Sequence, residues 1–157
     1  MKMFIIMFAL LFSVNVWAQA LVDITLKPAG SFKVKSTDIR GTATKKGDSV
    51  EAKNIIVGLK NLETGIALRN EHTKKHLETD KYPDAILVSA KGQGGKGEGV
   101  IKIKGIEQKI SGTYKIDGGK LVAQFPLKLS DFKIEGIKYM GVGVADDVTL
   151  TVTVPIK

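Results

Sequence analysis

The chain has 157 residues and contains no cysteine, so it has room for a single domain and can form neither a disulfide framework nor a lipid-anchored cysteine. Its formal net charge is +8, and the lysines are dispersed among few aromatic residues, which make up 6% of the sequence. Nucleic-acid binding needs clustered basic residues and stacking aromatics, so we expect a solvated basic surface that excludes nucleic acid as a partner and allows transient contact with an anionic membrane surface.

The segment 1–20 has the organisation of a secretory signal peptide. Lys2 supplies a short positive start, an apolar run follows, and Ala18-Gln19-Ala20 has the small-x-small pattern that signal peptidase accepts. We expect cleavage after Ala20, with cleavage after Ala18 as the alternative. The apolar run is short for a membrane span and no later segment reaches spanning length. We therefore predict an exported protein without stable membrane insertion, and the lack of cysteine fits the periplasm of a Gram-negative bacterium.

From Leu21 onward, apolar and polar residues alternate, as in strands that bury one face and expose the other. This alternation is present at 23–27, 31–36, 109–116, 120–129 and 146–156. About eight such strands are expected. Eight antiparallel strands can close into a small barrel, which removes the exposed sheet edges.

Turn residues and pattern breaks divide these runs. The strings KGD at 46–48 and DGG at 117–119 predict hairpins. The apolar phase shifts by one residue around 53–55, and Pro126 lacks a ladder donor, so we expect a bulge or local bend at each place. Only residues 68–79 predict a short helical segment.

A chain of this kind could also form a membrane barrel with its apolar face turned to lipid. Membrane barrels carry aromatic girdles, whereas the segment after the predicted signal contains only six phenylalanine and tyrosine residues and ends in Pro-Ile-Lys. A soluble barrel with an apolar interior and a lysine-rich exterior is therefore favoured. Eight strands enclose either a filled core or an elongated cavity, and the alternation alone slightly favours the filled core.

Two motifs suggest chemistry that their context does not support. GQGGKG at 92–97 matches the dinucleotide fingerprint, but an alternating strand follows it where the fingerprint requires a helix, so we predict a hairpin loop. Asp146 and Asp147 are adjacent at the start of a strand and would point to opposite faces. A capping or turn role is therefore expected for this pair. No G-x-S-x-G motif is present, so serine hydrolysis is not indicated.

His72 and His76 are the only histidines. They lie four residues apart in the predicted helix, a spacing that zinc-binding helices also use. Glu71 precedes His72, so the H-E-x-x-H motif is absent, and a third ligand would have to be a carboxylate such as Glu78 or Asp80. We expect a structural role or a place at the barrel mouth, with no metal and no catalytic residue. A metal-assisted hydrolase or isomerase using both histidines is the alternative, and a ligand-free interaction module with a packed core is another.

The segment TGIALRNEHTKKHLETDKYP at 64–83 resembles the signature of the YceI-like family, the periplasmic lipocalin-like proteins that bind polyisoprenoids. Further similar segments are SFKVK at 31–35, GVIKIKGIEQKI at 99–110 and the closing region 125–154, so the resemblance covers nearly the whole mature chain. The residues that fall on the family signature are Thr64, Gly65, Arg69, Asn70, His72, Tyr82 and Pro83, with asparagine at position 70 where aspartate is more usual.

Two positions depart from the family pattern. Ser36 replaces a histidine that often follows the Phe-x-x-Lys strand, and Gly41 is followed by Thr-Ala where an aromatic residue is common. If these positions shape the cavity, they change the ligand or the depth to which it enters.

The resemblance implies an all-β, eight-stranded antiparallel lipocalin-like barrel at 21–157, with one helical segment near 68–79. It implies a non-enzymatic periplasmic carrier without a cofactor, whose partner is a long-chain isoprenoid lipid such as a quinone or polyprenyl lipid. A homodimer is allowed. Arg69 is the best donor for a lipid head group, or else it pairs with Glu71 or a strand-end carboxylate. The predicted ligand-binding residues are Phe32, Val34, Leu59, Arg69, His72, Leu87, Ile101, Ile103, Tyr114, Phe125, Leu127, Val148, Leu150 and Val152.

Overall fold

The computed structural model describes residues 18–27, 30–139 and 141–157. Most of the predicted signal peptide, at 1–17, lies outside the described residues. The two helical segments are α1 (Ala67–Leu77) and the 3-10 helix η1 (Leu129–Phe132). The strands are β1 (Gln19–Lys27), β2 (Ser31–Ser36), β3 (Ile39–Arg40), β4 (Ala43–Lys46), β5 (Ser49–Gly58), β6 (Asp84–Gln93), β7 (Lys96–Ile103), β8 (Ile106–Asp117), β9 (Lys120–Lys128), β10 (Lys138–Tyr139), β11 (Val142–Val144) and β12 (Asp147–Pro155).

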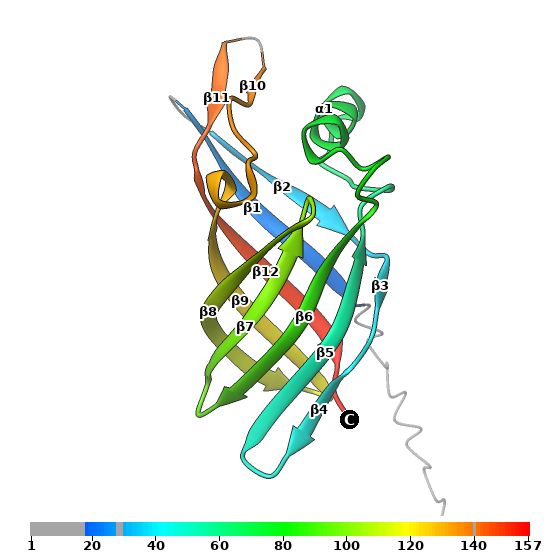
Figure 1. Ribbon diagram of the computed structural model, residues 1–157, viewed down its shortest axis with the longest axis vertical. Coiled ribbons are helices and arrows are strands. Elements are labelled where there is room, and N and C mark those ends of the chain that lie inside the picture. Colours follow the sequence, from blue (N-terminus) through cyan, green and yellow to red (C-terminus); the bar gives the residue numbers. More distant parts are fainter. Residues whose placement is uncertain (1–17, 28–29, 140) are drawn as a thin grey trace, which may run out of the picture.

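One sheet contains all of these strands and curls into a barrel (Figure 1). Its hydrogen-bonding order is β10-β11-β1-β12-β9-β8-β7-β6-β5-β3, with β2 paired to β1 and β4 paired to β5. The two sides of the sheet meet where Ala43 forms a parallel bridge with Ile156 and accepts a hydrogen bond from the Lys157 amide at 3.0 Å. The predicted all-β class is confirmed. The described residues form twelve strands instead of the predicted eight, because short β3, β4, β10 and β11 join the eight that have six residues or more.

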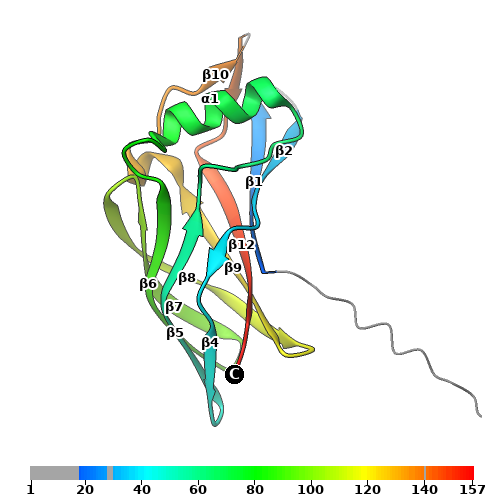
Figure 2. The ribbon, with the colours of Figure 1, turned by 90° about the vertical axis from the view of Figure 1, so that its right-hand side faces the viewer.

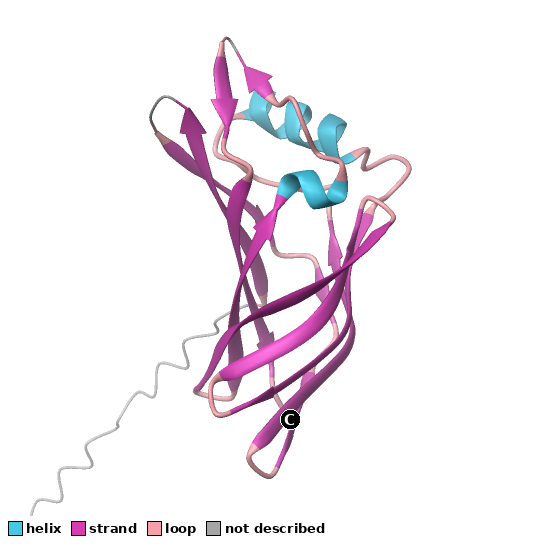
Figure 3. Ribbon diagram, turned by 60° about the vertical axis from the view of Figure 1, so that its left-hand side comes forward, coloured by secondary structure: helices cyan, strands magenta, loops and turns pink. Residues whose placement is uncertain are grey.

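The two ends of the barrel differ (Figure 2). Helix α1 crosses the end that we call the upper end, and η1 lies at the same end (Figure 3). The turns between β4 and β5, between β6 and β7 and between β8 and β9 lie at the opposite, lower end (Figure 1). These three connections are the hairpins predicted at 46–48, 92–97 and 117–119, which are confirmed.

The expected irregularity at 53–55 is also present. Asn54 has a left-handed φ of 50°, and the buried side of β5 changes there, from Val50 and Ala52 to Ile55. Across the sheet, the pairing of β6 with β7 shifts register between Leu87 and Ser89, the residues opposite this part of β5. The two irregularities are therefore cross-strand neighbours, and together they bend the sheet.

No register shift occurs at Pro126, so of the bulge or local bend expected there, the bulge is not formed. Pro126 pairs with Thr149 in the same register as the rest of β9 and β12. The pairing of β9 with β8 ends at Gln124. Pro126 therefore lies beyond the last paired residue on that side, where a missing amide donor is tolerated.

Asp146 acts as a cap, as expected for the Asp146-Asp147 pair. Its carboxylate accepts hydrogen bonds from the Ser130 amide at 2.7 Å and from the Ser130 hydroxyl at 2.7 Å. These bonds satisfy backbone and side-chain donors in the first turn of η1. The start of β12 and η1 are thereby joined at the upper end of the barrel.

Candidate functional site

An apolar cavity of about 450 Å³ occupies the upper part of the lumen. Strands on all sides of the barrel contribute inward side chains to its wall, and α1, η1 and the segment between η1 and β11 contribute residues at the upper end. The wall is aliphatic and aromatic almost throughout. Its few polar side chains are Ser36, Arg69, His72, Thr73, His76 and Lys138, and no described carboxylate is among them.

The structure brings thirteen of the fourteen predicted ligand-binding residues together in the wall of this cavity. Those on strands occupy alternate positions, as the period-two pattern requires, whereas Arg69 and His72 come from α1 and Leu59 follows β5. Tyr114 is the exception, because it lies in the wall of a separate, smaller cavity near the lower end of the barrel. The thirteen are Phe32, Val34, Leu59, Arg69, His72, Leu87, Ile101, Ile103, Phe125, Leu127, Val148, Leu150 and Val152.

Several wall residues were not predicted from the sequence. Phe132 and Ile134 are buried and come from η1 and the residue after its cap, where the alternation of strands no longer applies. Leu62 comes from a loop, and His76 and Leu77 come from α1. A helical spacing of three and four residues connects Arg69, His72, Thr73, His76 and Leu77, so this face of α1 could have been recognised from the sequence.

Position 36 shows how a departure from the family pattern affects the wall. Ser36 is buried, lines the cavity and donates a hydrogen bond from its hydroxyl to the Gly58 carbonyl at 2.6 Å. A serine occupies less space than a histidine, so the wall recedes here. Its only polar side-chain group is satisfied by the backbone, which leaves this part of the wall apolar towards the lumen.

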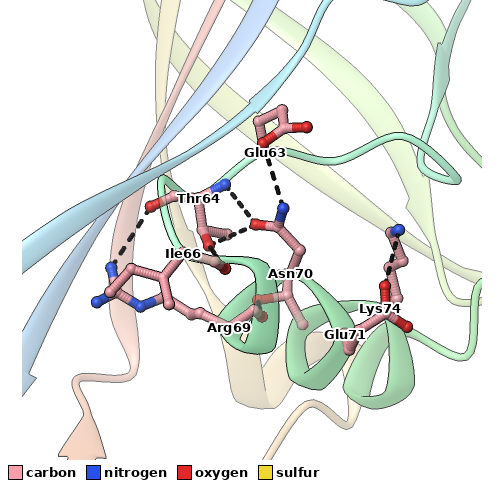
Figure 4. Close-up of polar contacts among 8 residues, drawn as sticks. Glu63, Thr64, Ile66, Arg69, Asn70, Glu71 and Lys74 are labelled. Atoms are coloured by element: carbon pink, nitrogen blue, oxygen red, sulfur yellow. Dashed lines mark hydrogen bonds and ion pairs between the residues drawn. The ribbon is translucent and has the colours of Figure 1, made fainter.

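The loop before α1 is tied to the helix by Asn70 (Figure 4). The Asn70 Oδ1 accepts hydrogen bonds from the Thr64 amide at 2.7 Å and from the Thr64 hydroxyl at 2.6 Å. The Asn70 Nδ2 donates to Glu63 Oε2 at 3.2 Å. Ile66, the N-cap residue, has no side chain that can cap the helix, so Asn70 fixes the start of α1 from within its first turn.

Replacement of Asn70 with alanine should lower the free energy of unfolding by about 1–3 kcal/mol, because it leaves the amide of the buried Thr64 without its acceptor and the Thr64 hydroxyl with only the Ile66 carbonyl, at 3.2 Å. Urea unfolding measures the change. Glu71→Ala is the matched control on the same helix, since Glu71 is exposed and its ion pair with Lys74 should contribute under about 1 kcal/mol. Equal losses in both variants would contradict this role of Asn70.

Arg69 lies between the helix and the cavity. Its guanidinium is centred 4.3 Å from the centroid of the Phe32 ring, a cation–π contact. Its Nη1 donates to the Thr64 carbonyl at 3.5 Å (Figure 4). The predicted pairing with Glu71 is not formed, because Glu71 pairs with Lys74 at 3.3 Å. Arg69 therefore both anchors the loop and presents a cation at the cavity wall.

Both histidines line the cavity at the upper end. Burial, the neighbouring His72 and then Lys104 hold the pKa of His76 below its usual value. His76 is therefore neutral at neutral pH, so one ring nitrogen can donate a hydrogen bond and the other can accept one. Within 18–27, 30–139 and 141–157, no group of three or more histidine, cysteine, aspartate or glutamate side chains is arranged to bind a metal ion.

The far end of α1 is held by a lysine from the turn between β7 and β8. Lys104 Nζ lies 3.4 Å from Glu78 Oε2, at the C-cap of α1, and donates to the Lys133 carbonyl at 3.0 Å. The next residue, Gly105, lies under the Tyr82 ring, where an added Cβ would come within 2.9 Å of a ring carbon. Lys104 and Tyr82 thus join the helix segment to the barrel rim.

The helix itself was predicted at 68–79 and is observed at Ala67–Leu77, ending at Glu78 in a left-handed conformation. None of its residues is fully buried. In the part of the chain that the structure describes, no helix is long and apolar enough to cross a membrane.

These features define an antiparallel β-barrel that encloses an apolar cavity beneath a short helix. The chain belongs to the YceI-like family, because the model of the YceI-like domain matches residues 12–156. The predicted family membership is therefore confirmed. No curated protein matches the chain significantly.

Several solved structures share this fold. BcnA from Burkholderia cenocepacia is 16% identical, with 85% of this chain and 94% of that chain covered and a TM-score of 0.63. A polyisoprenoid-binding domain from Saccharophagus degradans is 12% identical, with 87% and 91% covered and a TM-score of 0.57. A mutant CJ YceI protein with a monobromobimane guest is 16% identical, with 77% and 81% covered and a TM-score of 0.58. At these identities the similarity shows the fold alone.

Proposed function

We propose that the protein is a non-enzymatic periplasmic carrier that binds the tail of a long-chain isoprenoid lipid, such as a quinone or polyprenyl lipid, in the upper cavity. The observation that carries the proposal is a 450 Å³ cavity with an aliphatic and aromatic wall. Burial of each methylene-sized group contributes about 0.8 kcal/mol. A few isoprene units therefore offset the cost of ordering the tail.

The polar residues of the wall suggest where the lipid head group lies. Arg69, His72 and His76 belong to α1 and Lys138 to β10, so all four come from elements at the upper end. A head group placed there would meet donors and cations and no described carboxylate. Oxygen acceptors such as a quinone carbonyl or a phosphate fit this set. The tail would then extend downward into the lumen.

The proposal is tested by native mass spectrometry of untagged protein purified from the periplasm of its own source, followed by organic extraction. We expect a co-purifying isoprenoid lipid, and we expect lipid-free protein to take up geranylgeraniol. Protein that is empty and binds no prenyl alcohol would contradict the proposal. Metal analysis of the same preparation tests the alternative of a metal-assisted hydrolase or isomerase. A stoichiometric metal ion that is present in the wild type and lost in His72→Ala would favour that alternative. Oligomeric state and contact with anionic vesicles can be measured on the same material.

A further inference from the structure

The lumen contains a second cavity below the first. The upper cavity measures about 450 Å³ and the lower about 40 Å³. Four residues belong to the walls of both cavities: Ile55, Leu87, Phe125 and Val152. These residues come from β5, β6, β9 and β12. They form a partition across the lumen, which we call the floor.

Glycines allow the aromatic residues at and below the floor to lie close to the sheet. A Cβ added at Gly112 would overlap the backbone carbonyl oxygen of Gln124 and come within 2.6 Å of the Phe125 ring. A Cβ added at Gly92 would overlap the Tyr114 ring. Glycine is used in strands where another group approaches the backbone closely. A larger residue at position 112 would clash with the Phe125 ring, and a larger residue at position 92 would clash with the Tyr114 ring.

Below the floor, the lumen is packed except for the small lower cavity. A separate cluster of small and aliphatic side chains from β4, β5, β9 and β12 fills this region. It consists of Ala43, Val50, Ala52, Ile55, Leu121 and Val154. The slight preference for a filled core that the sequence suggested is therefore correct for the lower part of the barrel and wrong for the upper part.

We infer that the floor limits the length of the lipid tail that the barrel can bury, with Phe125 as the main determinant. The inference rests on the proposed function. A carbon atom with its hydrogens occupies roughly 20–25 Å³ at the packing density of protein interiors. A cavity of about 450 Å³ thus holds about twenty carbons, or about four isoprene units. Isoprene units beyond that number stay outside the lumen, so they should add no further affinity.

The limit can be measured with a series of all-trans prenyl alcohols that increase in length from geraniol through farnesol and geranylgeraniol to solanesol. Affinities of lipid-free protein are determined by native mass spectrometry or calorimetry. In the wild-type protein, we expect affinity to rise with length up to geranylgeraniol and then to level off. In Phe125→Ala, the removed ring joins the two cavities. The rise should continue to a longer alcohol, with a gain of at least about tenfold beyond geranylgeraniol.

Leu127→Ala is the matched control. Leu127 lies two residues from Phe125 on the same strand and lines only the upper cavity. Its truncation widens the cavity without opening the floor, so the longest alcohol that still gains affinity should be unchanged. Phe125→Leu, which keeps an apolar side chain but removes the ring, repeats the test if the alanine variant does not fold.

The outcomes separate this inference from the proposed function. Wild-type binding that levels off near geranylgeraniol, together with a longer limit in the Phe125 variant alone, supports the floor. The role of the floor is contradicted if affinity levels off at the same alcohol length in the folded Phe125 variant as in the wild type. It is also contradicted if Leu127→Ala changes that length equally. Neither result contradicts lipid binding itself. Wild-type protein that binds none of the alcohols overturns both.

Discussion

Ile103→Trp is expected to weaken binding of geranylgeraniol by at least about 100-fold, because the larger ring occupies space in which several methylene groups would otherwise be buried. Ile103 lies at the upper end of β7 and lines the cavity. It is half-buried, so the indole can be accommodated with less overpacking than at a fully buried position. Calorimetric titration of lipid-free protein measures the loss.

Ile116→Trp provides the control for this substitution. Ile116 lies on β8 near the lower end, is 44% exposed and is not part of either cavity wall. The same chemical change there should leave affinity and the unfolding temperature nearly as in the wild type. If the two tryptophan variants bind geranylgeraniol equally well, Ile103 does not border the bound tail.

Phe132→Ala is expected to lower the free energy of unfolding by about 3–5 kcal/mol, the usual range for truncating a buried aromatic residue. Phe132 is 2% exposed and is one of the two largest fully buried side chains described. Phe132 belongs to the larger hydrophobic cluster of the barrel, which includes Leu127 and Val148 of the upper cavity wall. It is placed there by η1, a helix of only four residues. Urea unfolding of lipid-free protein gives the value.

Leu68→Ala is the comparison for Phe132→Ala. Leu68 lies on α1, is 52% exposed and belongs to neither hydrophobic cluster. Its truncation should change the free energy of unfolding by under about 0.5 kcal/mol. A loss below about 1 kcal/mol in Phe132→Ala would show that η1 does not secure the upper end of the barrel.

The strands could be predicted because each buries one face and exposes the other. Val148, Leu150 and Val152 alternate with threonines in β12, and all three line the upper cavity. The shift in the apolar alternation around Asn54 could also be predicted, since the inward-facing side of β5 changes there. In both cases the information is local, because two neighbouring residues in a strand must point to opposite faces.

The placement of Tyr114 could not be predicted in the same way. Its alternation with Ile110 and Gly112 indicates which face of β8 it occupies, but it does not give the height of the residue within the barrel. Height depends on strand tilt and register across the whole sheet. Whether the lumen is filled or open depends on the summed volumes of facing side chains, and this sum differs between the two ends.

The contribution of Asn70 also lay beyond residue-by-residue reasoning. The family signature includes Thr64 and position 70, but it assigns no structural role to either residue. The structure shows that they bond to each other. An aspartate at position 70 could accept the same two bonds but could not donate to Glu63, so the asparagine and the nearby carboxylate suit each other here.

Helix α1 is secured mainly by polar contacts at its two ends, at Asn70 and at Glu78, and has no fully buried side chain. Segments with little apolar burial open at a lower free-energy cost than the strands of a barrel. In the proposed carrier, a lipid that enters past α1 would do so at a rate limited by the opening of these few contacts. The rate of entry and the depth reached by the tail would then depend on separate parts of the molecule, the first on the ends of α1 and the second on the barrel wall and the floor.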